Sequence, residues 1–101
     1  VEPIRDAGNF AVRTDTLVEK LLIEGGRVTG VQVRRAGVAQ SLLARRGVIL
    51  SAGAFNSPQI LMLSGIGPAA HLKAHGIEVV RDRAGVGGNL QDHIDYVSGW
   101  E

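Results

Sequence analysis

Three histidines are the residues whose chemistry is easiest to recognise in the sequence. His71 and His75 are four positions apart, so one helix face could present both to a metal ion. No carboxylate or third ligand follows at a suitable spacing, and imidazoles near a helix end are the favoured interpretation. His93 follows Asp92, but no serine or cysteine at a strand-to-helix elbow accompanies this pair. We therefore predict neither a catalytic residue nor a metal site in this chain.

Small residues follow a short apolar run, and together they could admit a ligand. The run Gly47-Val48-Ile49-Leu50-Ser51 is typical of a strand buried on both faces of a parallel sheet, and Ala52-Gly53-Ala54 comes directly after it. In open α/β sheets, ligands bind beyond the carboxyl ends of such strands, where small residues allow close approach to the backbone. Spacing alone favours a tight strand-to-helix turn, with a ligand site as the alternative.

A glycine-rich segment, Gly85-Val86-Gly87-Gly88-Asn89, is the third candidate. Its glycines do not fit the dinucleotide fingerprint Gly-x-Gly-x-x-Gly, and no helical pattern follows directly. A connecting loop is therefore favoured over a phosphate-binding loop.

Composition limits the classes of partner. The chain has 101 residues, of which 45% are hydrophobic and 21% charged, with a formal net charge of +1. These proportions are typical of a soluble globular protein, and the length suits one domain with a modest core. A near-neutral chain lacks the basic face that displaces counterions, which argues against nucleic acid as a partner. Two separate arginine pairs, at 34–35 and 45–46, are interpreted as solvated surface.

Cysteine is absent, which excludes disulfides, thiol catalysis and cysteine-ligated metals. No apolar run approaches the roughly 18 residues that a membrane helix needs. We expect a cytoplasmic location, with membrane association of a longer parent protein as the alternative. The chain begins at Val1 without a methionine and ends at Trp100-Glu101, so we expect a piece of a longer polypeptide.

The elements that must position these residues begin with a predicted antiparallel β-meander over about 9–46. Its connections are too short for crossovers, and Gly25-Gly26 indicates a tight turn. Apolar residues at alternate positions or in short runs mark four expected strands, at 10–14, 17–23, 28–33 and 41–44.

A strand-turn-helix segment is expected over 47–67, followed by a helix, a short strand and an exit loop over 68–101. Ser57 is a good N-cap, Pro58 suits the first helical position, and an apolar surface nearly all round predicts a buried helix. A second helix should run from Pro68 to about His75, with Gly76 just past its end and a strand at 77–80. The predicted fold class is α/β, and no linker divides the chain, so we expect one compact unit.

Residues 53–67, GAFNSPQILMLSGIG, closely resemble a signature of the glucose–methanol–choline (GMC) oxidoreductases. The flanking segments resemble that family in the same order: NFAVRT at 9–14, VTGV at 28–31, GVILSAG at 47–53 and GVGGNLQDH at 85–93. The resemblance covers nearly the whole chain and is strongest to choline dehydrogenase-like members.

The resemblance implies a part of an FAD-binding domain, spanning 1–101, from an enzyme that oxidises an alcohol by hydride transfer to the flavin. Family members hold the pyrophosphate upstream and place the catalytic histidine far downstream, and no segment here matches either part. It also implies that the backbone of Val18 meets the adenine and that Ser51, Ala52 and Gly53 lie against the adenosine half of FAD. The Ser57-Pro58 helix and residues 64–67 are then structural.

The fragment is therefore expected to be inactive and not to retain FAD. Its partners would be the rest of the parent chain and, in the parent, a small alcohol such as choline. The apolar strand at 47–51, without its neighbours, predicts self-association of the fragment. The alternatives are a stand-alone nucleotide-binding module, which the missing phosphate loop disfavours, and a structural or interaction module, which the intact signature disfavours.

Overall fold

The computed structural model describes residues 8–96, 98 and 99. The two chain ends named above, Val1 and Trp100-Glu101, lie outside these residues. The chain divides into two compact units, residues 1–50 and 51–101, where the sequence predicted one. The boundary falls in the segment 44–52, which forms no strand or helix.

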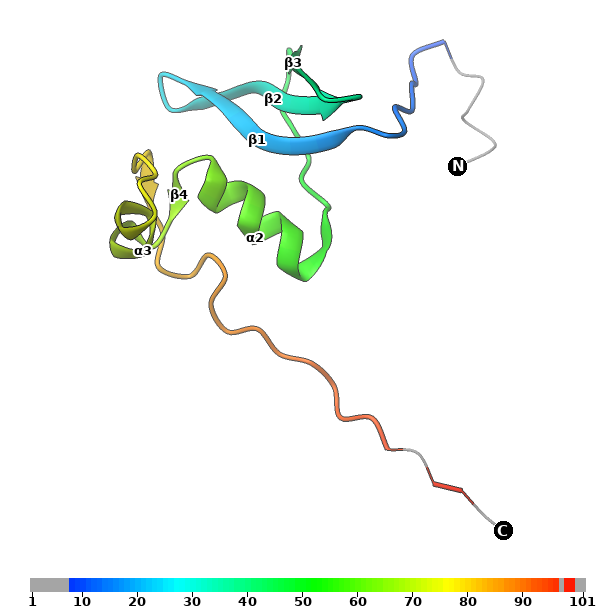
Figure 1. Cartoon of the computed structure of the whole chain (residues 1–101), viewed down its shortest axis with the longest axis vertical. Helices are drawn as coiled ribbons and strands as arrows, with labels where there is room; N and C mark the ends of the chain where they lie inside the picture. The colour runs from blue at the N-terminus through cyan, green and yellow to red at the C-terminus, as the bar shows by residue number, and fades with distance from the viewer. Residues whose placement is uncertain (1–7, 97, 100–101) are drawn as a thin grey trace. The chain divides into compact units, whose positions relative to one another are not determined.

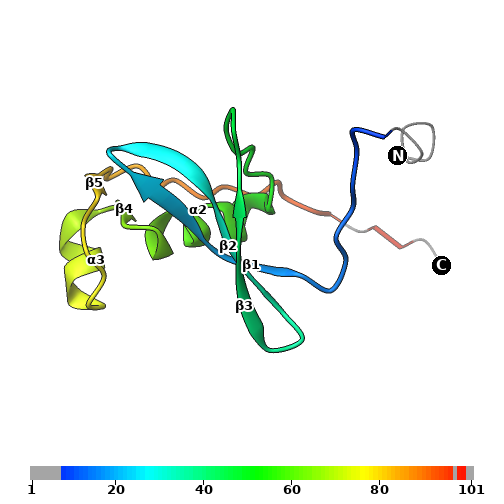
Figure 2. The same ribbon diagram turned by 90° about the horizontal axis from the view of Figure 1, so that it is seen from above.

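The first unit is a three-stranded antiparallel sheet. Its strands are β1 (Leu17–Glu24), β2 (Arg27–Arg35) and β3 (Val38–Leu43), in the order β1-β2-β3 (Figures 1 and 2). Each strand pairs with the next along the chain, which confirms the predicted meander.

Residues in the left-handed backbone region make both connections. Gly25 and Gly26 have φ values of +55° and +77°, a conformation that glycine adopts without strain. Ala36 and Gly37, at +47° and +79°, turn the chain between β2 and β3. Consecutive positive φ values match the right-handed twist of the flanking strands, which is why these two-residue turns form tight hairpins.

Two predicted strands are not observed. Residues 10–14 form no ladder, and Val12 is 61% exposed. Residues 47–51 form none either, and the Ile49 side chain is 93% exposed. Both segments have the right residues, but a strand also needs a neighbour whose backbone groups it can bond, and the described chain provides none for them.

The sheet is held by a small apolar centre and by one close backbone contact. Leu21 on β1 and Val33 on β2 are 7% and 2% exposed. Gly30 lies opposite Leu43, and a Cβ atom added to it would lie 2.2 Å from the carbonyl oxygen of Leu42. Only glycine allows β2 and β3 to approach so closely.

Gly30→Ala should therefore destabilise the sheet by about 1–3 kcal/mol, the usual cost of overpacking. The free energy of unfolding, measured in urea at fixed protein concentration, tests this. Gly47→Ala is the matched control, because a Cβ there meets no atom within 4 Å. An equal loss in both variants would contradict the close approach.

The second unit contains α2 (Gly53–Leu63), β4 (Ile66–Gly67), α3 (Ala69–Ala74) and β5 (Arg81–Asp82). β4 and β5 form a parallel pair. Together with the meander, these elements confirm the α/β fold class. No helix of the described residues is long and apolar enough to cross a membrane.

Helix α2 begins at Gly53, four residues before the predicted N-cap at Ser57. The Ser57 hydroxyl accepts a hydrogen bond from the backbone N–H of Ala52 at 2.9 Å, so it stabilises the first turn from inside the helix. Pro58 lies within the helix rather than at its first position. Only Ile60 is buried, whereas Phe55 is 74% exposed. Among the described residues, the predicted burial of this helix is therefore not observed.

Helix α3 ends as the sequence predicts, with Gly76 at φ +69°. The N–H of Gly76 bonds to the carbonyl of Lys73 at 3.0 Å, and that of Ile77 to Leu72 at 2.9 Å, the Schellman pattern. The following strand is displaced: β5 lies at 81–82 instead of 77–80, where Arg81 pairs with Ile66 and Asp82 with Gly67 of β4.

Candidate cofactor site

Ser51, Ala52 and Gly53 form an exposed corner at the start of α2. Gly53 has φ +90°, a conformation that side chains disfavour. A Cβ atom built there would meet no other atom within 4 Å. The side chains of the described residues therefore do not fill this corner, which leaves room for a ligand to approach its backbone.

The corner is held in shape by the helix that follows it. The backbone N–H of Ala52 donates a hydrogen bond to the Ser57 hydroxyl, so this N–H is not available to a ligand. The loop cannot open without losing that hydrogen bond. A helix leaves the N–H groups of its first turn without partners inside the helix, which makes this end favourable for polar or anionic ligand atoms. The groups of this corner that can bond a ligand therefore belong to its backbone.

Val18, the fourth predicted site residue, belongs to the first unit. It lies half-buried on β1, opposite Val33. β1 is an outer strand of the described sheet, since it pairs only with β2. One edge of β1 therefore presents backbone groups that no strand of this sheet bonds, which is where a ligand could meet the backbone.

Next to Val18, the ladder between β1 and β2 contains an irregularity that the sequence reasoning missed. Val18 pairs with Val33, but Lys20 pairs with Gln32, so Glu19 is an extra residue on β1, a β-bulge. The available signal was the spacing of apolar residues, because Val18 and Leu21 are three apart rather than two.

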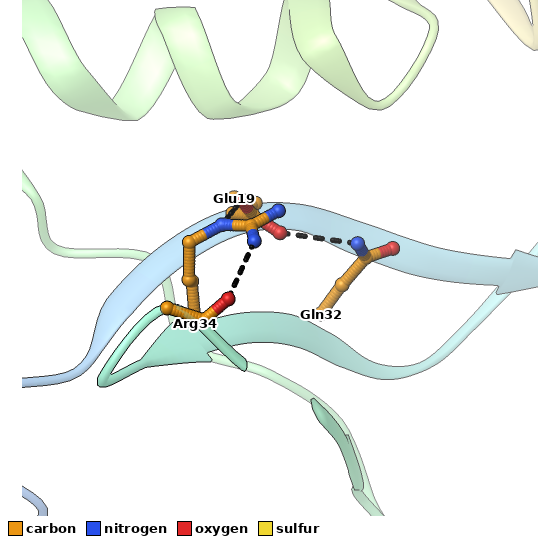
Figure 3. Close-up of polar contacts among 4 residues, drawn as sticks. Glu19, Gln32 and Arg34 are labelled. Carbon is orange, nitrogen blue, oxygen red and sulfur yellow. Dashed lines mark hydrogen bonds and ion pairs between the residues drawn. The ribbon is translucent and has the colours of Figure 1, made fainter. Parts of the chain in front are cut away.

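A polar cluster, here called the Glu19 clamp, covers this bulge (Figure 3). Glu19 Oε1 accepts from Arg34 Nε at 2.6 Å, and Oε2 accepts from Gln32 Nε2 at 3.1 Å. Arg34 Nη1 also donates to the carbonyl of Gly37 at 3.0 Å, which links the clamp to the turn after β2. The side chains of Glu19 and Arg34 are 23% and 46% exposed, so water screens the pair only in part.

The clamp predicts a pH dependence of stability. The hydrogen bond from Arg34 is the main reason that the pKa of Glu19 lies below its usual value of 4.5; partial burial opposes this, while Gln32 and nearby positive charge reinforce it. The pKa of Glu19 is lower in the folded state than in the unfolded state. The stability that the clamp contributes is therefore complete above the unfolded-state pKa and is lost as the pH falls through the folded-state pKa.

Thermal unfolding of the wild type and Glu19→Gln at a series of pH values would measure this. At neutral pH the wild type should have the higher Tm, and its advantage over Glu19→Gln should be largest there. This difference in Tm should narrow once the pH falls below 4.5. A difference that grows toward acid pH would contradict the assignment.

The glycine-rich segment forms a turn that packs on α2, as expected for a connecting loop. Val86 N–H bonds to the carbonyl of Arg83 at 3.1 Å, and Gly88 N–H to that of Gly85 at 3.2 Å. A Cβ on Gly87 would lie 3.4 Å from Met62 Cε. A shallow hollow of about 340 Å³ lies beside the turn, lined by Met62, Pro68, His71, Ala84, Val86, Gly87 and Gly88.

The histidines engage their neighbours instead of a common centre. The rings of His71 and His75 are 4.4 Å apart between centroids, and His75 Nδ1 lies 2.9 Å from the carbonyl oxygen of His71. His93 Nδ1 lies 3.1 Å from Asp92 Oδ1, with both side chains almost fully exposed. Among the described residues, no three histidine, aspartate or glutamate side chains come close enough together to hold a metal ion.

Known proteins of one family resemble this chain over nearly its whole length. A sequence model of the GMC oxidoreductase family matches residues 1–95. Oxygen-dependent choline dehydrogenase from Rhizobium etli is 58% identical over 80 residues, which make up 79% of this chain and 15% of that protein. Patulin synthase from Aspergillus clavatus is 55% identical over 89 residues, or 87% of this chain and 14% of that protein.

The fold is shared as well. A solved FAD-dependent oxidoreductase from Chaetomium thermophilum matches 84% of this chain with a TM-score of 0.81 and 31% identity, over 15% of its own length. The chain thus spans about 15% of the length of the relatives that it matches.

Proposed function

The chain belongs to the GMC oxidoreductase family, and from that premise we propose that it is a segment of an FAD-dependent enzyme that oxidises the CH–OH group of an alcohol. The observation that carries this proposal is the open corner at Gly53, where a built Cβ would meet no atom of the described residues within 4 Å beyond its chain neighbours and its own helix backbone. A corner filled by side chains would exclude the adenosine half of FAD, and the open space at Gly53 supports its binding there.

The residues of this chain would hold the cofactor by backbone contacts. Ser51, Ala52 and Gly53 would lie against the adenosine half, and the outer edge of β1 at Val18 would meet the adenine. When bound, FAD accepts a hydride from the alcohol. The contribution of this segment is to bind and orient one end of the cofactor, while the group that takes the substrate proton belongs to another part of the polypeptide. The isolated chain should accordingly be inactive and should not retain FAD.

The substrate is a small alcohol, and choline or a related polar primary alcohol is the specific proposal. The identity to a choline dehydrogenase supports it. A patulin synthase is nearly as similar over this segment, so the residues that discriminate between substrates lie elsewhere. We propose a cytoplasmic location for the parent protein, with membrane association as the alternative.

The rest of the parent polypeptide is the natural partner of this segment. It would cover the side chains of Ile49 and Phe55, which are 93% and 74% exposed. Burial of large apolar side chains away from water is favourable. In the isolated chain, a second copy would take that place, through the unpaired segment 47–51.

Purification of the longest natural polypeptide that carries this segment, beside the isolated 101 residues, tests the proposal. The long protein should be yellow, should release FAD on denaturation, and should have its flavin bleached by a primary alcohol without oxygen. The isolated chain should be colourless and should not turn over the alcohol. A long protein without flavin, or an isolated chain that turns over alcohol, would contradict the proposal.

A further inference from the structure

Gln32 and Arg34 flank the residue that lies opposite Val18. That residue, Val33, is 2% exposed and pairs directly with Val18 across the ladder. Both flanking side chains bond to Glu19, the residue after Val18 (Figure 3). The clamp therefore joins the two strands directly around the Val18–Val33 pair.

The bulge at Glu19 decides which face of the sheet Val18 occupies. Leu21 lies opposite Val31, and Val18 lies opposite Val33, so these two β1 residues share the face of Val31 and Val33. In a regular strand, residues three apart point to opposite faces. The extra residue at Glu19 restores Val18 to the same face as Leu21. A one-residue slip of β1 against β2 would turn Val18 to the opposite, polar face.

We propose that Glu19 is a positioning residue, whose clamp on Gln32 and Arg34 holds the β1 backbone at Val18 in the conformation that receives the adenine of FAD. This inference rests on the proposed function. An extra residue in a ladder lacks a backbone partner of its own, so nothing in the ladder fixes its place. A carboxylate with one donor on each side of Val33 fixes that place. Without it, only the apolar packing of Val18 and Leu21 opposes migration of the bulge along β1, and the edge at Val18 has a less defined geometry.

The test uses the full-length polypeptide that carries this segment, stripped of flavin. AMP is the probe for the adenosine half of the site and riboflavin for the ring half, with FAD as the complete ligand. Glu19→Ala should weaken AMP and FAD by about tenfold each, the effect of losing a charged hydrogen-bond partner. Riboflavin affinity should not change. Glu19→Gln, which keeps an oxygen for Arg34, should recover part of the loss. Glu24→Ala, at the other end of β1, is the control and should bind all three ligands like the wild type.

The outcomes separate two failures. If the wild type binds FAD but Glu19→Ala leaves AMP and FAD binding unchanged, the positioning role is wrong while the flavin proposal stands. If Glu19→Ala weakens riboflavin as much as AMP, the residue serves general stability, and the positioning role is also wrong. If the wild type binds neither FAD nor AMP, the proposed function itself fails.

Discussion

Gly53→Val in the full-length polypeptide is expected to weaken FAD binding about a hundredfold, an effect of roughly 2.7 kcal/mol. The backbone at Gly53 has φ +90°, where a β-branched residue is strained by about 1–3 kcal/mol. In addition, a side chain there would extend into the open space at the corner, where the adenosine half is proposed to lie. Equilibrium binding of FAD to the flavin-free protein measures the loss.

Strain and obstruction are separated by Gly76→Val. Gly76 has φ +69° and, like Gly53, no atom within 4 Å of a built Cβ, but it lies at the end of α3 and outside the proposed site. This variant should lose a similar amount of thermal stability and keep its affinity for FAD. If both variants lose FAD equally, the corner at Gly53 has no special part in binding. If Gly53→Val binds FAD like the wild type, the adenosine half lies elsewhere.

The isolated chain should self-associate, and one exposed side chain should control much of this. The monomer mass is 10.7 kDa, and light scattering should give about twice that or more, rising with concentration. Ile49 is 93% exposed within a segment that has strand-like residues and no strand partner. Ile49→Lys should lower the mass toward that of the monomer, because a charge on an open edge opposes strand pairing.

Val80→Lys is the matched control for this experiment. Val80 is also exposed, at 48%, but its backbone N–H is already bonded to the carbonyl of Gly65. Its substitution should therefore leave the association unchanged. A wild-type chain that stays monomeric at high concentration would disprove the proposal.

The meander illustrates what sequence patterns predict well. Three of its four expected strands lie close to observed ones, because turns such as Gly25-Gly26 act locally and need only adjacent residues, whereas the strand expected at 10–14 is not observed. The predicted strand at 47–51 shows the opposite case. Its residues favour a buried strand, yet strand formation depends on neighbours, and none of the described residues pairs with it.

The start of α2 and the Glu19 clamp were missed for different reasons. Ser57 was expected to cap the helix, because serine before proline is a common first-turn pattern, but its hydroxyl instead bonds back to Ala52. The clamp depends on Gln32 and Arg34, which come near Glu19 only through the strand register. The sequence could have indicated the bulge through its broken apolar period, but it could not identify the partners.

We propose that this segment holds the adenosine half of a flavin through small residues at one corner and the edge of one strand. Photolabelling of the full-length polypeptide with 8-azido-AMP, followed by mass spectrometry of its peptides, tests it most directly. We predict labels on peptides that contain residues 51–57 and 17–24, and their suppression by FAD. Labels that fall entirely outside residues 8–96, or that FAD does not suppress, would contradict it.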